Sequence, residues 1–257
     1  MEISYHNIHY SLISADFPVV QTERYILRLA ENKADLESIF RLRFDVFNLE
    51  LGLGYSSSNL SQMDQDEFDD VCDHLILIAR DTDETIGTYR MQTYEMAAQG
   101  LGFDGADVFN LPIIPESILK TSVEVGRACV AKKYRNSQTL LLLWKGLTNY
   151  LLWTQNQYFF GCASLLTQCP QQAACALQYF RQNNLMHPSI LVYPNAGFIL
   201  ELPQIVPESC AVDIPKSLQS YLSIGAKICS LPAIDNNFKT IDFLIISNIA
   251  DFARWGY

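Results

Sequence analysis

Acidic and basic side chains recur at short intervals in three separate segments of this chain. One segment holds Glu124 and Arg127, three residues apart, and a second ends in Arg90. The third, residues 66–74, contains four aspartates, one glutamate and one histidine. Arginine–carboxylate pairs in strand-like surroundings orient polar substrates and shift the pKa values of neighbouring groups. The spacing therefore predicts a charged site rather than a purely structural surface.

Length and composition indicate a folded protein with a substantial core. The chain has 257 residues, of which 49% are hydrophobic and 18% charged, enough for one large α/β domain or a core domain with an extension. Its seven cysteines include no CxxC pair, and the N-terminus shows no signal-peptide pattern. We therefore expect the protein in a reducing cytoplasm. The apolar window 140–153 is too short to cross a bilayer, which leaves peripheral contact with the inner face of the membrane open.

Metal and nucleic-acid binding are not expected. The cysteines and the four histidines show no metal-ligand spacing, so no metal is predicted. The formal net charge is −10, which disfavours a nucleic-acid partner.

The acidic balance is nevertheless uneven along the chain. Residues 125–200 contain no Asp or Glu, although they carry six basic residues. The six are Arg127, Lys132, Lys133, Arg135, Lys145 and Arg181. This segregation predicts a local docking patch for an acidic partner. The alternative is a stretch that simply has few charges of either sign.

Hydrophobic periodicity gives the order of elements. Strands are expected at 25–30, 75–79, 85–91, 122–130, 158–166 and 241–246, and helices at 33–49, 137–153, 171–181 and 216–222. Residues 52–59 and the Gly/Pro-containing region from 100 to 121 are expected to form loops. The order predicts a mixed α/β fold with a mostly antiparallel central sheet flanked by helices. Three parts are expected: an N-terminal segment 1–23, a core 24–185 and an extension 186–257 packed on the core.

Several short motifs occur in a characteristic order. They are Leu42-Arg43, Phe47, Glu50-Leu-Gly52, Asp66-Glu-Phe-Asp69, Cys72-Asp-His74-Leu75, Gly87-Thr-Tyr-Arg90, Glu124-Val-Gly-Arg127, Tyr134-Arg135 and Leu143-Trp144, followed by 221–229, 232–235 and 238–243. Together they span about residues 24 to 250. In these motifs the chain resembles bacterial ornithine–acyl-carrier-protein N-acyltransferases, the hemolysin-like group of the GNAT superfamily. It is also similar to N-acyl amino acid synthases and acyl-homoserine-lactone synthases.

The resemblance implies a GNAT-like fold and a specific activity. A long-chain fatty acyl group, 3-hydroxylated in some cases, would pass from acyl carrier protein to the α-amine of an amino acid, foremost ornithine, in lyso-ornithine lipid synthesis. No separate cofactor is implied, because phosphopantetheine arrives on the carrier protein. Two alternatives stay open: a signal synthase that acylates S-adenosylmethionine, and a non-catalytic module that binds an acidic carrier protein.

One departure from the superfamily bears on the donor. Acetyl-CoA-dependent members hold pyrophosphate in a glycine-bearing turn at a helix N-terminus. The corresponding turn here, residues 134–139, contains no glycine, so side chains hinder close backbone approach. A carrier-protein donor presents a single phosphodiester and is favoured over coenzyme A.

Aminolysis of a thioester needs a base and donors for the oxyanion. Glu50, which we expect in a loop after the first helix, is the first candidate base; otherwise it is a solvent-facing glutamate at a helix end. Asp66, Glu124 and Arg127 are further catalytic candidates, although Glu124 and Arg127 equally suit a structural ion pair. Backbone N–H groups of residues 127–129 are expected to stabilise the oxyanion.

The remaining candidates concern binding. Asp69 is expected to bind the substrate ammonium or to orient arginines. Arg43 and Arg90 are expected to form an ion-pair network with Asp69 and Glu124, or to clamp the substrate carboxylate. His74 is a further candidate for substrate binding, although a histidine packed in the core is the simpler interpretation. Contact with the phosphopantetheine phosphate or with the carrier protein is expected from Lys132, Lys133 and Arg135. Cys129, Cys162 and Trp144 are interpreted as core residues.

Overall fold

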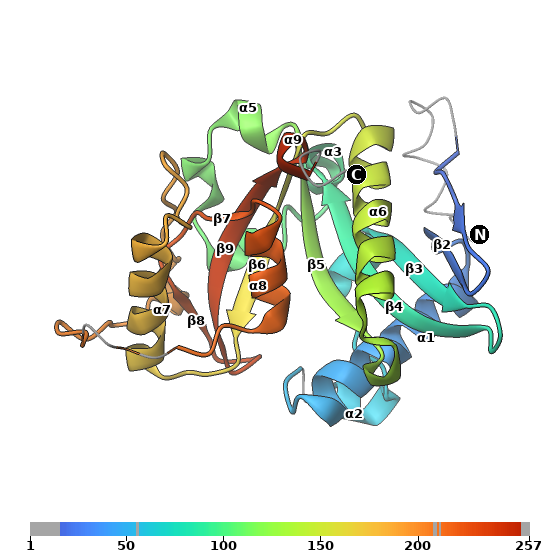
Figure 1. Ribbon diagram of the computed structural model, residues 1–257, viewed down its shortest axis with the longest axis horizontal. Coiled ribbons are helices and arrows are strands. Elements are labelled where there is room, and N and C mark those ends of the chain that lie inside the picture. Colours follow the sequence, from blue (N-terminus) through green and yellow to red (C-terminus); the bar gives the residue numbers. More distant parts are fainter. Residues whose placement is uncertain (1–15, 55–56, 208–209, 211, 253–257) are drawn as a thin grey trace. The chain divides into compact units, whose positions relative to one another are not determined.

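The computed structural model describes residues 16–54, 57–207, 210 and 212–252, which divide into two compact units. The first unit comprises Met1–Gly102 and Val123–Asn156, and the second comprises Phe103–Ser122 and Gln157–Tyr257 (Figure 1). The predicted boundaries after residues 23 and 185 stay predictions. Residues 1–15 of the predicted N-terminal segment lie outside the described residues.

The first unit is built on an antiparallel sheet. Its strands follow in sheet order as β1 (Val20–Gln21), β2 (Tyr25–Leu29), β3 (Asp73–Ala79), β4 (Glu84–Thr93) and β5 (Ser122–Val130). Each strand pairs antiparallel with the next. The expected strands all form, and β5 has the expected bounds: polar and apolar residues alternate over 122–125, and 128–130 are apolar.

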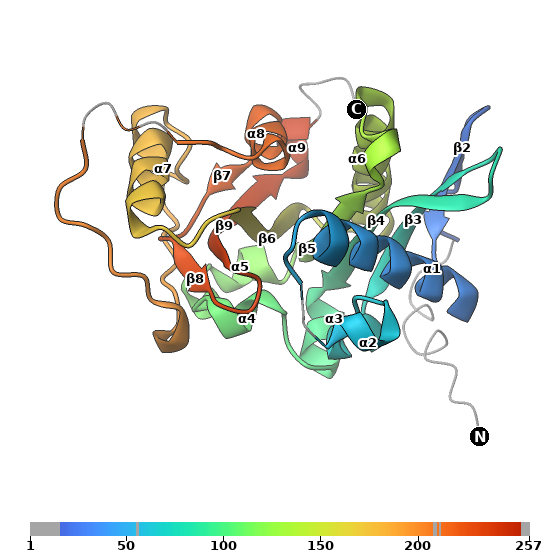
Figure 2. The same ribbon diagram turned by 90° about the horizontal axis from the view of Figure 1, so that it is seen from below.

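Two helices cover opposite faces of this sheet. Helix α6 (Ser137–Trp153) packs so closely that a Cβ added at Gly146 would stand 2.7 Å from the side chains of Leu27 and Leu75. Helix α1 (Lys33–Phe44) covers the other face and buries Ile39 and Phe40 with residues of β3. Figure 2 shows α6 and α1 on either side of β3 and β4.

A side-chain cap explains where α6 begins, and a change from α-helix to π-helix explains why α1 ends earlier than expected. Asn136 accepts a hydrogen bond from the Thr139 amide at 3.1 Å, so α6 starts at the predicted residue. The expected single helix 33–49 instead ends at Phe44 and continues as a π-helical turn, Asp45–Glu50. A helix α2 (Ser58–Ser61) occupies part of the expected loop 52–59, and α3 (Tyr94–Gln99) follows β4.

The second unit has its own antiparallel strands and core. Strand β9 (Thr240–Asn248) pairs with β6 (Tyr158–Leu165), β7 (Lys227–Ile228) and β8 (Ala233–Asp235). Helices α7 (Pro170–Gln182) and α8 (Lys216–Ser223) lie between β6 and β7 in the chain, and α9 (Ile249–Phe252) follows β9. Short helices α4 (Gly105–Val108) and α5 (Glu116–Leu119) lie in the expected loop 100–121. Phe180 and Phe243 meet edge to face at 5.2 Å in this core.

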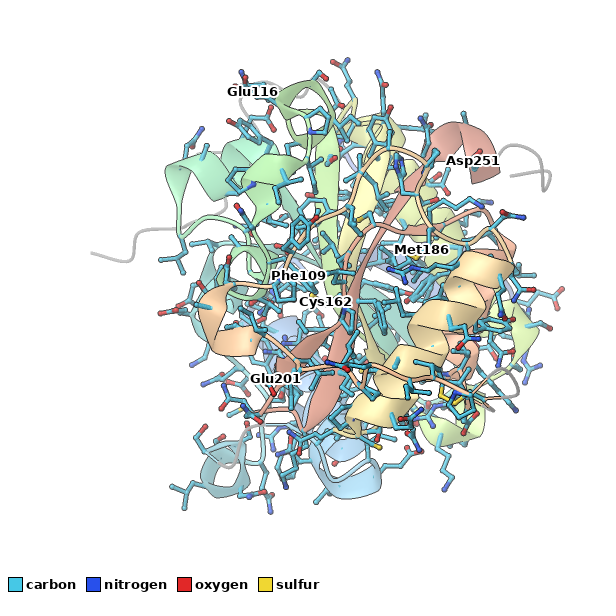
Figure 3. The ribbon with its side chains drawn as sticks, turned by 90° about the vertical axis from the view of Figure 1, so that its left-hand side faces the viewer. Phe109, Glu116, Cys162, Met186, Glu201 and Asp251 are labelled. Atoms are coloured by element: carbon cyan, nitrogen blue, oxygen red, sulfur yellow. A yellow bond between two sulfur atoms is a disulfide. The ribbon has the colours of Figure 1, made fainter. Side chains whose placement is uncertain are left out.

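The cysteines only partly follow expectation. Cys129 is buried as expected, whereas Cys162 on β6, labelled in Figure 3, is exposed, so its assignment to the core was wrong. Residues 161, 163 and 165 of β6 are buried, and Cys162 lies on the opposite face of the strand, which is less covered at that position. Cys175 on α7 forms a disulfide with Cys210.

The described residues settle the fold class and whether a helix could span a membrane. Its strands and helices confirm the mixed α/β class with mostly antiparallel sheets flanked by helices. Among the described residues, no helix combines the length and apolar character required to cross a membrane.

Candidate active site

The segment between Asp66 and Asp69 is held by its own carboxylates. Asp66 Oδ1 accepts from the Phe68 amide at 3.0 Å, and Asp69 Oδ2 accepts from the Asp66 amide at 2.8 Å. This reciprocal pair caps the 3₁₀ turn Glu67–Asp70 at its N-terminus. The turn therefore fixes both aspartates and directs their remaining carboxylate oxygens to arginines.

Arg43 forms the fully buried end of an ion-pair network in the first unit. Its Nη1 donates to Asp69 Oδ1 at 2.7 Å and its Nε donates to Asp64 Oδ1 at 2.8 Å. The Arg43 side chain is 0% exposed, so its charge must be balanced locally. Asp64 was not among the residues predicted from the sequence; an apolar helix face carrying an arginine was the only signal that a buried partner was needed.

Arg90 and Arg127 complete the network from β4 and β5. Arg90 Nη1 contacts both Asp66 Oδ1 and Asp69 Oδ1, the latter at 3.0 Å. Arg127 Nη2 donates to Asp66 Oδ2 at 2.6 Å. Five predicted site residues, Arg43, Asp66, Asp69, Arg90 and Arg127, thus belong to one network.

The network keeps its aspartates ionised. Burial by itself would raise the pKa of Asp66 and of Asp69, but the charges of the arginines outweigh burial and lower both pKa values. Burial lowers the pKa of His74, whose Nε2 lies 3.1 Å from the backbone oxygen of Asp69 and whose ring meets Phe40 edge-on. His74 therefore favours its neutral form and packs against α1.

A β-bulge lies next to this network. Thr88 pairs with Cys129 and Arg90 with Gly126, so β5 carries one residue more than β4 over this stretch. Arg127 sits in the bulge with φ +48°, a left-handed conformation that costs free energy for any residue except glycine. The bulge leaves Arg127 and Ala128 outside the regular ladder, and these are two of the three residues at which the sequence predicted backbone donors.

Glu124, Gln92 and Cys72 extend the polar face of the sheet. Glu124 is buried on β5 and pairs across the ladder with Gln92, which is also buried. Burial raises the pKa of the Cys72 thiol, Arg90 opposes the change, and Glu124 adds to it. The thiol stays protonated and is a poor nucleophile. Gln92 was missed, although its place two residues after Arg90 on a strand put it on the same face.

Glu50 lies against the basic turn. It ends the π-helical turn, rather than following a helix in a loop, and its carboxylate accepts two hydrogen bonds from Arg135 at 2.6 and 2.8 Å. This pairing lowers the pKa of Glu50. Lys133 binds Glu84 at 2.7 Å, and Lys132 is exposed. Part of the positive charge of the turn is therefore balanced within the chain.

Comparison with known proteins identifies the family. Residues 42–145, which include Arg43, Asp66, Arg127 and Arg135, match the Acetyltransferase (GNAT) domain. The L-ornithine N(alpha)-acyltransferase of Brucella abortus (strain 2308) is 31% identical over 232 residues, covering 86% of this chain and 83% of that protein. The chain belongs to the L-ornithine N(alpha)-acyltransferase family.

Other comparisons agree with this family. The L-ornithine N(alpha)-acyltransferase of Rhizobium meliloti (strain 1021) is 29% identical over 231 residues, covering 85% of this chain and 78% of that protein. The crystal structure of the AHL synthase LasI aligns with a TM-score of 0.50 at 10% identity, covering 88% of this chain and 90% of that chain, which shows a shared fold. The predicted GNAT-like fold and the resemblance are confirmed, and the chain is an acyltransferase.

Proposed function

We propose that this chain transfers a long-chain fatty acyl group, 3-hydroxylated chains included, from acyl carrier protein to the α-amine of ornithine, forming lyso-ornithine lipid. Relatives that align over most of the chain are named L-ornithine N(alpha)-acyltransferase, which supports this acceptor. The observation that carries the proposal is the bulge at Arg127, beside a network that holds arginines and ionised carboxylates at fixed positions.

The reaction is aminolysis of a thioester. The α-ammonium first loses a proton to a base, and its nitrogen then forms a bond to the thioester carbonyl carbon. The C–S bond breaks as the nitrogen gives up a second proton, which the released carrier thiolate takes up. Backbone N–H groups around Ala128 are proposed to stabilise the tetrahedral oxyanion. Because a thiolate leaves readily, deprotonation and positioning of the amine are the main demands on the protein.

Glu50 is proposed as the base, directly or through one water. Its paired carboxylate is ionised at neutral pH and can accept a proton, although the contact with Arg135 weakens its basicity. Asp66 contacts two arginines and is better suited to orient them than to accept a proton. Arg90 and Arg127, fixed by Asp66, are then proposed to hold the acceptor carboxylate.

The carrier-protein donor is supported by the start of α6. Asn136 and Thr139 cap this helix with their own side chains, and no glycine allows backbone to approach a pyrophosphate. The first helical amides and the neighbouring Lys132 suit a single phosphodiester, and an acidic carrier protein complements the basic turn. We therefore assign phosphopantetheine rather than an adenosine diphosphate moiety to this end of α6.

A coupled assay tests the proposal. Purified protein is given long-chain acyl carrier protein, with and without a 3-hydroxyl group, together with ornithine or a panel of other amino acids. Thiol release and mass spectrometry of the product are followed, with the matching acyl-CoA as the control donor. Release with ornithine and acyl carrier protein supports the proposal. Absence of release with every acyl length and acceptor overturns it, and preference for acyl-CoA overturns the donor assignment.

A further inference from the structure

Trp144 is a buried indole whose N–H group lacks a hydrogen-bond partner. It lies on α6 and is 7% exposed, as expected for a core residue. Among the residues that the structure describes, its Nε1 has no acceptor. A buried tryptophan N–H ordinarily finds one, because leaving a buried donor unmade costs free energy. Packing alone therefore does not account for this indole, and its N–H calls for an acceptor from outside the chain.

The contacts of α6 show in which direction Trp144 leaves the helix. A Cβ added at Gly146 would stand 2.7 Å from Leu75 on β3, and one added at Gly87 on β4 would stand 3.3 Å from Leu143. Moving from Gly146 to Leu143 turns by about 60° around the helix, and Trp144 lies about 100° further in the same sense. Because β5 follows β4 in the sheet, the side chain of Trp144 is directed to the β5 side of α6.

The same contacts give the level of Trp144 along β5. The β4 residue that meets Leu143 pairs with Val130. The β3 residue beneath Gly146 pairs with Tyr89, which lies opposite the bulge of β5. Trp144 stands between these two levels. It is therefore within about 5 Å of the bulge along the strand direction, the rise of three helical residues.

The two faces of the sheet separate the two substrates of the proposed function. Gly87 faces α6, so alternation puts Arg90 on the other face, where it shares a carboxylate with Arg43 of α1. The acceptor carboxylate is assigned to that face. The donor phosphodiester is assigned to the start of α6, beside Asn136, about 10 Å of helix before Trp144. An arm that runs from there to the bulge passes the Trp144 indole.

We propose that the Trp144 indole N–H donates a hydrogen bond to the phosphopantetheine amide carbonyl nearer the sulfur, and so positions the thioester at the bulge. The indole is a donor only, and a neutral carbonyl is a matching acceptor. A single ethylene unit separates this amide from the sulfur, so a thioester at the bulge brings the amide to the level of Trp144. The inference rests on the proposed function for the path of the arm.

The binding test follows the indole N–H directly. The chain has three tryptophans, and NMR of protein isotope-labelled at the indole nitrogens distinguishes them. Trp144→Phe identifies the Trp144 signal by its loss. Trp153→Phe identifies the control, a second tryptophan of α6, which packs against Phe17. The probes are phosphopantetheine and acyl carrier protein whose thioester is replaced by an unreactive thioether. Both should move the Trp144 signal downfield and leave the Trp153 signal in place.

The kinetic test compares two small donors that carry the same acyl group. The N-acetylcysteamine thioester keeps the nearer amide, and the pentanethiol thioester has a similar length without it. With ornithine as acceptor, Trp144→Phe should lower kcat/KM for the first donor about 2- to 10-fold, the range for one neutral hydrogen bond, and leave the second unchanged. Trp153→Phe should change neither.

A second variant separates the N–H group from the volume of the ring. Benzothienylalanine at position 144 carries sulfur in place of the indole N–H and fills nearly the same space. It should show the same selective loss as Trp144→Phe, and it should unfold at the wild-type temperature because only an unmet donor is removed. An equal loss for both donors, or a Trp144 signal that neither probe moves, overturns the inference.

The two proposals fail separately. Acyl transfer from acyl carrier protein to ornithine with a fixed Trp144 signal would overturn the role of Trp144 and leave the proposed function standing. A Trp144 signal that moves with both probes, without any acyl transfer, would overturn the proposed function and support the site for the arm. Absence of both the shift and transfer in the wild-type protein overturns both.

Discussion

Arg127 reaches Asp66 across 61 residues of sequence, with Nη2 2.6 Å from Oδ2, from a backbone position whose φ is +48°. A left-handed arginine is unfavourable in isolation. The ion pair offsets part of that cost and holds the bulge in one conformation. The same residue thus links the side-chain network to the backbone donors proposed for the oxyanion.

Removing this link should impair both catalysis and stability. Asp66→Asn leaves Arg90 and Arg127 facing a neutral amide, so we expect a loss of kcat/KM of at least tenfold and a loss of about 3 kcal/mol in the free energy of unfolding. Steady-state kinetics and chemical denaturation measure the two effects. Glu67→Gln, an exposed change in the same turn, is the control. Wild-type kinetics in Asp66→Asn would show that the network does not serve the reaction.

The pH profile tests Glu50 as the base. Glu50→Gln should lower kcat about 10²- to 10⁴-fold without affecting folding, because the acceptor amine loses its proton acceptor. Arg135 lowers the pKa of Glu50, so Arg135→Gln should let that pKa rise and move the acidic limb of the kcat/KM profile to higher pH. Glu84→Gln, which loses a comparable ion pair to Lys133, is the control. An acidic limb that Arg135→Gln does not move would assign the base elsewhere.

The sequence predicts strongly patterned elements better than features set by tertiary contacts. Strand β5 and helix α6 have the expected bounds because the apolar, valine-containing pattern of 122–130 and the Asn136 cap are local signals. The bulge is not visible in sequence, since positive φ falls on Arg127 and not on the neighbouring Gly126.

The site residues likewise differ in how far the sequence alone singles them out. Charged residues such as Asp66 and Arg90 were selected because charge is conspicuous among apolar residues. Gln92 is neutral, and only the sheet register and its unmet hydrogen bonds single it out. Glu50 was assigned to a loop because helical periodicity does not distinguish a π-helical turn from the end of a helix.

Charge reversal tests the docking patch. Lys132 is exposed beside the start of α6, so Lys132→Glu should raise KM for acyl carrier protein several-fold at low ionic strength and leave kcat unchanged. The difference from wild type should shrink as salt screens the charges. Lys145→Glu, an exposed reversal within α6, controls for net charge. Equal effects of both variants would indicate general charge repulsion without a local patch.

Close packing of α6 on the sheet makes Gly146 sensitive. Its Cβ would stand 2.7 Å from the side chains of Leu27 and Leu75, so Gly146→Ala should lower the free energy of unfolding by about 1–3 kcal/mol despite alanine's higher helix propensity. Denaturant titration measures the change. Gly197→Ala is the control, because nothing lies within 4 Å of the added Cβ. A Gly146→Ala variant as stable as wild type would mean that α6 shifts readily on the sheet.

A buried carboxyl in the second unit should make stability depend on pH. Burial raises the pKa of Asp242 to about 6, although Thr240 Oγ1 donates to its Oδ1 at 3.1 Å. Because the folded pKa lies above the unfolded value, the stabilising contribution is full below pH about 4 and is lost as pH rises through about 6.

An asparagine in place of Asp242 would imitate the protonated acid at every pH. Asp242→Asn should therefore match wild type near pH 4 and be more stable above pH 7, by at most about 3 kcal/mol for a two-unit shift. Denaturation midpoints measured from pH 4 to 8 test this, with exposed Asp81→Asn as the control. A constant loss of stability at all pH values would instead show that the hydrogen bonds of the carboxylate outweigh its burial.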